Sequence, residues 1–64
     1  MPAVWTGELV GEMHNAGISA RDLAKELGLT PAYVSMILNG HREPPDVEEK
    51  MRAALERLKE QKGA

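Results

Sequence analysis

Four segments of the chain carry apolar residues at the three- and four-residue spacing of amphipathic helices, and no segment alternates with the two-residue period of a strand. The pattern predicts helices at about 4–15, 19–27, 30–39 and 46–61. We therefore expect an all-α fold, a small four-helix bundle that residues 1–64 form as a single domain. Because a chain this short buries only about 60% of the surface that its unfolded form exposes, its stability is expected to be marginal.

Residues that favour helix ends stand at the borders of the second and third expected helices. Ser19, with Asp22 three residues later, predicts a capping box, and Thr30 with Pro31 predicts an N-cap followed by a first helical turn. Gly28 is expected to end the second helix. The connection is then only GLT, and a short turn with glycine between two amphipathic helices is typical of a helix-turn-helix.

A helical wheel divides the third expected helix into an apolar side and an outer side. Val34, Ile37 and Leu38 share the apolar side, which predicts that they are buried. The other residues form a small, uncharged outer side: Ala32, Tyr33, Ser35, Met36 and Asn39. Such a surface fits the DNA major groove, about 12 Å wide, where serine and asparagine bond phosphates or base edges and alanine and methionine contact thymine methyl groups.

Three residues of this outer side leave two interpretations open. Met36 has the helical spacing of a core methionine, but the wheel favours an exposed contact. Tyr33 either stacks on a sugar or covers the neighbouring helix. Asn39 either caps the end of the helix or contacts DNA, and the two roles are compatible.

The charge of the chain argues mildly against nucleic acid, because the formal net charge is -2, with 8 lysines and arginines against 10 acids, whereas DNA-binding domains are usually basic. The three lysines and arginines of the first 45 residues, however, are all expected near the proposed DNA-binding face. Free N–H groups at the starts of the second and third helices add partial positive charge that binds phosphates. We therefore predict phosphate contacts from Ser19, Arg21, Lys25, Thr30, Asn39, His41 and Arg42.

The segment ISARDLAKELGLTPAYVSMILNG resembles the core of the lambda-repressor and Cro type of helix-turn-helix, the XRE family. The resemblance covers about residues 4–46, and the residues that carry it are Leu23-Ala24, Gly28, Val34-Ser35, Ile37 and Asn39-Gly40. It implies a cytoplasmic transcription regulator of bacterial or phage type, a repressor that binds a palindromic operator in double-stranded DNA as a homodimer. It also implies base contacts from Pro31, Ala32, Tyr33, Ser35 and Met36.

The chain departs from the family in two respects. The family often has glutamine at the first positions of both helices of the motif, where this chain has Ala20 and Pro31. Base readout is therefore expected to be sparse. Many members have two further helices after the motif, whereas one long helix is expected here, so that the dimer surface is expected to differ.

The last expected helix carries an apolar stripe, formed by Val47, Met51, Ala54, Leu55 and Leu58. Three short helices offer little surface to cover this stripe. We expect Leu55 and Leu58 to pack across the two-fold axis of a dimer. In the alternative, both leucines fold back onto Trp5 and the first helix.

The sequence contains no pattern typical of an enzyme or of a site for a metal, a cofactor or a small molecule. There is no cysteine, and neither His14 nor His41 has a second histidine three or four residues away. The serines and threonines have no evident base to activate them. No apolar run approaches the roughly 20 residues that span a bilayer, and the start MPAVWTGE lacks the basic flank of a leader. A cytoplasmic location without membrane contact is expected.

One alternative function belongs to another class. The acidic balance and the missing glutamines also fit a protein-interaction module, such as an antirepressor or a subunit of a complex, that keeps the helix-turn-helix skeleton without binding DNA. Mixed duplex DNA at low salt distinguishes the two, because a DNA-binding protein should bind it measurably and an interaction module should not.

Overall fold

The computed structural model of the protein describes residues 4–63, which form four helices and no strand. The helices are α1 (Val4–Ala16), α2 (Ala20–Leu27), α3 (Pro31–Leu38) and α4 (Val47–Gly63). The expected all-α fold is confirmed, and α4 continues past its expected end at residue 61. The first three residues, with which the segment MPAVWTGE begins, lie outside the described residues.

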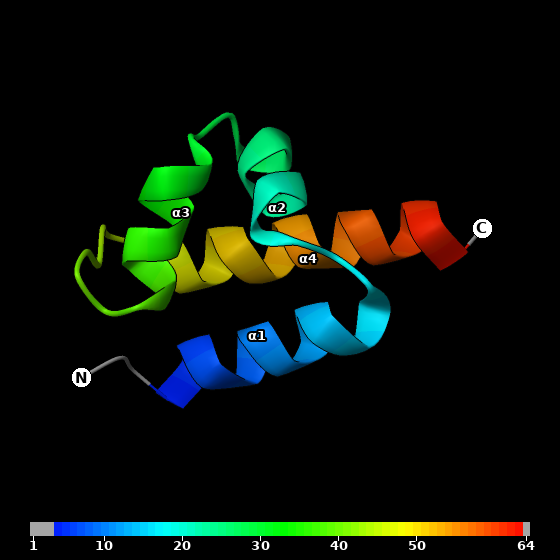
Figure 1. Ribbon diagram of the computed structural model, residues 1–64, viewed down its shortest axis with the longest axis horizontal. Coiled ribbons are helices and arrows are strands. Elements are labelled where there is room, and N and C mark those ends of the chain that lie inside the picture. The colour runs from blue at the N-terminus through cyan, green and yellow to red at the C-terminus, as the bar shows by residue number, and fades with distance from the viewer. Residues whose placement is uncertain (1–3, 64) are drawn as a thin grey trace.

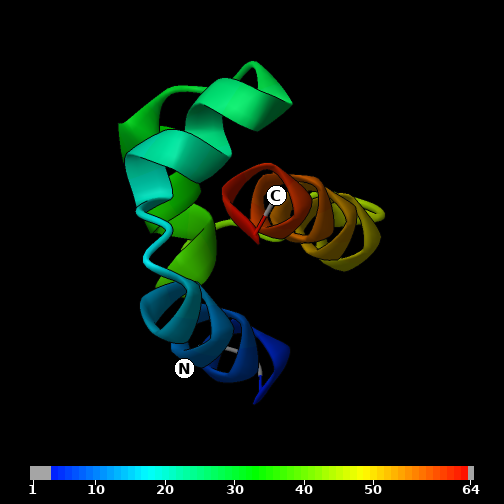
Figure 2. The same ribbon diagram turned by 90° about the vertical axis from the view of Figure 1, so that its right-hand side faces the viewer.

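The longest helix, α4, packs against α1 and α2, and α3 packs on α2 and α1. Figure 1 shows α1 beside α4 along the bottom of the view, with α2 and α3 above it. Figure 2, in which α4 is seen end-on, shows α1, α2 and α3 curving around one side of it. The protein measures 34 × 22 × 18 Å along its principal axes. The hydrophobic core therefore lies between α4 and the three shorter helices.

The start of α2 has the capping box that the sequence predicts. The Asp22 N–H donates to Ser19 Oγ at 3.1 Å, and the Ser19 N–H donates to Asp22 Oδ2 at 3.0 Å. Hydrogen bonding by Ser19, mainly through its backbone N–H, holds the pKa of the Asp22 carboxyl below its ordinary value. Two backbone donors that the first turn leaves free are thereby satisfied.

The end of α2 is fixed by Gly28, which has the left-handed φ of 71°. The N–H of the following residue, Leu29, donates to the carbonyl of Ala24 at 2.9 Å. This backbone bond, together with the left-handed glycine, is the Schellman motif that commonly ends helices. The chain therefore turns sharply at Gly28, as expected, and α3 begins only three residues later.

Buried side chains from all four helices meet in one core. Leu9 of α1, Leu23 of α2, Ile37 of α3 and Met51 of α4 are each no more than 1% exposed. Within residues 4–63 no buried side-chain nitrogen or oxygen lacks a hydrogen-bond partner. The core is thus closed inside a single copy of the chain.

Leu55 and Leu58 also belong to this core, with 1% and 9% of their surface exposed. The expectation that they pack across a dimer axis is therefore wrong, because side chains this buried leave almost no surface for a second copy. The alternative, in which they fold back into their own chain, is the one observed. The core cluster that contains them has Trp5 packed against it, and both α1 and α2 pack on α4, which covers the stripe.

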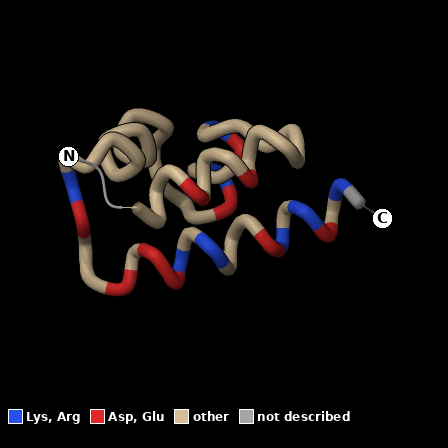
Figure 3. Tube along the Cα trace, turned by 90° about the horizontal axis from the view of Figure 1, so that it is seen from below, with Lys and Arg blue, Asp and Glu red and all other residues tan. Residues whose placement is uncertain are grey.

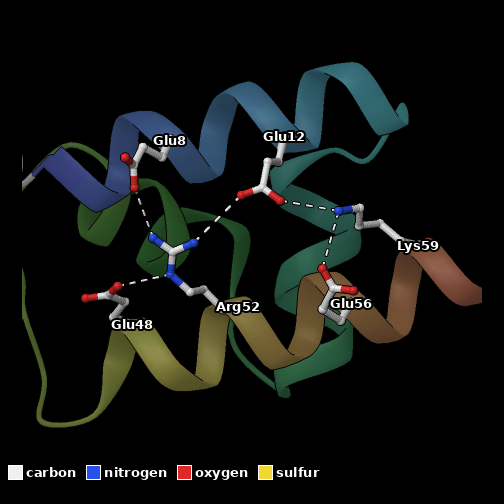
Figure 4. A network of polar contacts seen from close by, with 6 residues as sticks. All are labelled: Glu8, Glu12, Glu48, Arg52, Glu56 and Lys59. Carbon is white, nitrogen blue, oxygen red and sulfur yellow. Dashed lines mark hydrogen bonds and ion pairs between the residues drawn. The ribbon is translucent and has the colours of Figure 1, made fainter.

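Six charged residues connect α1 to α4 at the surface (Figure 4): Glu8, Glu12, Glu48, Arg52, Glu56 and Lys59. Arg52 Nη2 lies 3.2 Å from Glu8, and its Nε lies 3.0 Å from Glu48. Lys59 Nζ lies 3.3 Å from Glu12, and this hydrogen bond is the main reason that the pKa of Lys59 is raised. Because exposed pairs add little stability each, we infer that the network mainly fixes how α1 sits on α4.

Two glycines inside α1 should be sites of simple stabilisation. Gly7 and Gly11 lie on the exposed side of the helix, and a Cβ added at either would meet nothing within 4 Å. Replacing either by alanine should raise the free energy of unfolding by about 0.5–1 kcal/mol, because alanine loses less backbone entropy in a helix. Urea denaturation followed by circular dichroism measures the change.

Gly28→Ala is the matched control for these substitutions. Space is also open at this position, but its φ of +71° is unfavourable for an L side chain. It should therefore lower the free energy of unfolding, by about 1 kcal/mol. An equal gain from Gly11→Ala and Gly28→Ala would contradict this account of both positions.

Candidate nucleic-acid interface

The start of α3 is fixed by Thr30 and Pro31. Thr30 has the extended conformation of an N-cap, and its Oγ1 accepts a hydrogen bond from the Tyr33 N–H at 3.1 Å. Pro31 follows at the first position of the helix, where its missing N–H leaves no bond unmade. Both capping predictions are confirmed, and the first turn of α3 is rigidly joined to the end of α2.

One side of α3 is buried and the other is exposed. Val34 and Ile37 are no more than 1% exposed, as expected, whereas Leu38 is only partly buried at the edge of the core. The exposed side carries Ala32, Ser35 and Asn39, which we call the outer row. Pro31 is also exposed, at the N-terminal end of the helix. The outer row contains no charged side chain and no large one.

Met36 and Tyr33 are less exposed than the outer row. Met36 is half-buried, so the expectation of a fully exposed methionine is only partly met. Tyr33 lines an apolar cleft of about 230 Å³ with Leu27, Leu29 and Pro44. Tyr33 is also packed against the hydrophobic core. This position favours the alternative in which Tyr33 covers the neighbouring helix over a contact with a base or a sugar.

The end of α3 brings Asn39 back onto Ser35. Asn39 is the C-cap, and its Nδ2 donates to the Ser35 carbonyl at 2.8 Å and to Ser35 Oγ at 3.2 Å. Gly40 then adopts a φ of 81°, and the His41 N–H donates to the Met36 carbonyl at 2.8 Å. The chain is thereby turned at the end of α3, and His41 lies directly after the helix.

Most of the cations of α4 are occupied within the protein. Arg52 and Lys59 belong to the network with α1, Arg57 Nε lies 2.7 Å from Glu26, and Lys62 Nζ donates to the Gly17 carbonyl at 2.8 Å. Figure 3 shows the positively and negatively charged positions following one another along α4, the long segment that runs to the C-terminus. Among residues 4–63, the lysines and arginines with neither an ion pair nor a side-chain hydrogen bond are Arg21, Lys25, Arg42 and Lys50.

The unpaired cations do not all lie in the same place. Arg21 is exposed in the first turn of α2, and Arg42 is exposed in the loop after α3. Lys25 borders a shallow cleft with Leu58 and Lys62, so it lies toward the C-terminal half of α4. Lys25 therefore lies near α4, and its contact with a phosphate stays a prediction.

Lys50 is a cation that the sequence analysis missed. It is exposed in the first turns of α4, and it lines the same cleft as Tyr33 and the loop residues Pro44 and Pro45. Its neighbours Glu48 and Glu49 are acidic, but Glu48 is held by Arg52. Lys50 thus stands near the loop that follows Arg42, without an ion pair in the described part of the chain.

Between residues 4 and 63, no three histidine, aspartate or glutamate side chains lie close enough to hold a metal ion. No helix in this range has the length and apolar character needed to cross a bilayer. The exposed groups from which a binding surface can be built are the polar and cationic ones around α3.

Comparisons with known proteins agree with this geometry. A helix-turn-helix family model matches residues 14–48, which span the last turn of α1, the whole α2–turn–α3 unit and the loop to α4. The matched region covers more than half of the chain. Comparisons with curated proteins and with solved structures gave no match.

Proposed function

The chain belongs to the XRE-type helix-turn-helix family of lambda-repressor and Cro-like DNA-binding transcription regulators, and we propose that it is a sequence-specific repressor that inserts α3 into the major groove. The observation that carries this proposal is the outer row of α3, which is exposed, small and uncharged while the opposite side of the helix is buried. Such a ridge can enter a groove about 12 Å wide without leaving a charge unpaired there.

The proposed contacts follow from exposure around this ridge. Base contacts come from Pro31, Ala32 and Ser35, with half-buried Met36 at the margin, where its thioether reaches a thymine methyl. Phosphates are bound by a wider set of groups, which are Ser19, Arg21, Thr30, His41, Arg42 and Lys50. Ser19 and Thr30 contribute through the N–H groups of the helix starts that they cap. The contacts of Tyr33 and Lys25 lie elsewhere in the protein, and we leave both out.

We also propose that two copies bind a palindromic operator. The support is the family, in which the motif is used in pairs, since a single small ridge contacts few bases. The contact between the copies does not involve Leu55 and Leu58, which the core occupies. Analytical ultracentrifugation of the protein with its selected duplex tests the stoichiometry, and a strict one-to-one complex on a site without symmetry would refute the proposal.

A titration with mixed duplex DNA tests the proposal as a whole. At low salt, the cations around α3 should give measurable nonspecific binding, whose logarithm falls with the logarithm of salt concentration by about 0.9 for each phosphate contacted. With so few free cations we expect about two to four phosphates per copy, a shallow slope. Absence of binding at low salt would refute DNA binding and would favour a protein-interaction module.

Arg42→Ala should weaken binding to all duplexes by a similar factor, about three- to tenfold at moderate salt, because a phosphate contact carries no base information. The salt slope should fall by about one. Fluorescence anisotropy on a selected duplex and on an unrelated duplex measures both effects.

Arg57→Ala removes the same charge from α4, where Arg57 is held by Glu26 at 2.7 Å. It should leave the salt slope unchanged. If Arg42→Ala and Arg57→Ala changed affinity and slope alike, then overall charge would decide binding, and Arg42 would not be a specific phosphate contact.

A further inference from the structure

Ser35 and Asn39 form a hydrogen-bonded pair in the middle of the proposed DNA-binding surface. They lie one helical turn apart, both are exposed, and Asn39 Nδ2 contacts two Ser35 atoms, the carbonyl oxygen at 2.8 Å and Oγ at 3.2 Å. The amide nitrogen of Asn39 is therefore held by Ser35. A contact to phosphate needs a donor, and in this arrangement the donor nitrogen of Asn39 is directed at Ser35.

The orientation of the Asn39 amide follows from chemistry. A backbone carbonyl can only accept, so the amide atom 2.8 Å from the Ser35 carbonyl is the nitrogen and not the oxygen. The same nitrogen then reaches Ser35 Oγ, which must accept from it. Oγ retains its own proton, and within residues 4–63 no acceptor takes that proton.

We propose that Asn39 is a positioning residue for Ser35, holding its hydroxyl so that the proton is directed out of the outer row toward a base edge. This inference rests on the proposed binding of α3 in the major groove. It assigns Asn39 a role different from the phosphate contact that its sequence position suggests. Ser35 carries the one hydroxyl on the outer row, and the bond from Asn39 occupies one of its two lone pairs and leaves its proton free.

The direction of this hydrogen bond limits which bases Ser35 can recognise. A hydroxyl that accepts from Asn39 keeps its proton and one lone pair, and the acceptors that its proton can meet on major-groove edges are purine N7, guanine O6 and thymine O4. Cytosine presents only its N4 amino group, which is a donor. The base facing Ser35 should therefore preferably be a purine or thymine, because cytosine would leave the hydroxyl proton without an acceptor in the interface.

Selection of binding sites from a random duplex pool, followed by affinity measurements, tests this inference. Sites are selected with the unmodified protein, and dissociation constants are then measured for the selected duplex and for duplexes with each base pair replaced. The variants are Ser35→Ala, Asn39→Ala, the double variant and Ser35→Thr. Asn15→Ala is the matched control, since Asn15 is an exposed asparagine at the end of α1. Circular dichroism at the assay temperature establishes that each variant is folded.

Ser35→Ala and Asn39→Ala should each reduce the preference at the same base pair by about fivefold, the effect of one neutral hydrogen bond. The double variant should lose no more than either single one, because both substitutions remove the same oriented donor. Ser35→Thr, which keeps a hydroxyl, should retain the preference, and Asn15→Ala should behave as the unmodified protein.

Three other results would overturn the inference in distinguishable ways. If Asn39→Ala weakens binding to all duplexes equally and lowers the salt slope by about 0.9, Asn39 is a phosphate contact. If Ser35→Ala changes a preference that Asn39→Ala leaves intact, Ser35 acts without Asn39. If the unmodified protein selects no sequence, the proposed function itself fails, and the role of Asn39 fails with it.

Discussion

Leu55→Ala should lower the free energy of unfolding by about 3 kcal/mol, the middle of the range for a buried leucine that is cut back to alanine. Leu55 is 1% exposed and sits in the core to which all four helices contribute. A domain of 64 residues has only about 3–10 kcal/mol of stability in total. The melting temperature should fall by about 15 °C, and part of the population should be unfolded at 37 °C.

The concentration dependence of melting separates a core residue from a dimer contact. If Leu55 acts only within its own chain, the loss in melting temperature should be the same from micromolar to millimolar protein. A loss that vanished at high concentration would place Leu55 in an interface after all. Val10→Ala is the control, because Val10 is 45% exposed on α1, and it should change stability by no more than about 0.5 kcal/mol.

Ala32→Glu should reduce the affinity for operator DNA by about 100-fold or more while leaving the fold intact. Ala32 is exposed in the first turn of α3, so glutamate there meets no protein atom that it could displace from the core. A carboxylate near a helix start is favourable for the helix, and both residues are good helix formers. In the groove, however, the same carboxylate would face phosphates and base acceptors, and like charges brought together across an interface cost several kcal/mol.

Gln61→Glu adds the same charge at an exposed position near the end of α4. It should weaken DNA binding by less than about threefold, since charges more than about 10 Å apart are largely screened in ordinary buffer. Electrophoretic mobility shifts and thermal melting of both variants give the two readouts. Equal losses of affinity from Ala32→Glu and Gln61→Glu would mean that the outer row of α3 does not enter the DNA.

The parts of the fold that could be predicted from the sequence are those fixed by neighbours along the chain. The capping box at Ser19, the left-handed Gly28 and the Thr30-Pro31 start of α3 each depend on residues within one or two turns, and the structure has all three. Val34 and Ile37 were assigned to the core for a similar reason, because helical periodicity alone places them on one side.

What could not be predicted depends on segments that are far apart in sequence. The burial of Leu55 and Leu58 requires knowing that both α1 and α2 pack on α4, which an amphipathic pattern in α4 does not reveal. The pairing of Arg57 with Glu26 across 31 positions is equally hidden. It occupies Arg57, whereas Arg42 and Lys50 are among the few cations that stay free. A net charge of -2 therefore says little about the charge beside α3.

The base-reading part of the site was predictable only in part. Ser35 and Asn39 stand at a spacing that places them on one side of a helix, so their proximity follows from periodicity. Which of them donates to the other follows only from the atomic contacts at 2.8 and 3.2 Å. Tyr33 is the converse case, since its wheel position is near the outer side but it lines a cleft with the loop after α3.

The packing of α1 on α4 limits how early the molecule can fold during synthesis. Arg52 reaches back 44 positions to Glu8, and Lys59 reaches back 47 positions to Glu12. The α2–α3 unit, by contrast, is closed by short-range bonds that form as soon as those residues are available. On the ribosome, α1 can therefore make its contacts with α4 only after nearly all of α4 has left the exit tunnel. The chain should become protease-resistant in one late step rather than helix by helix.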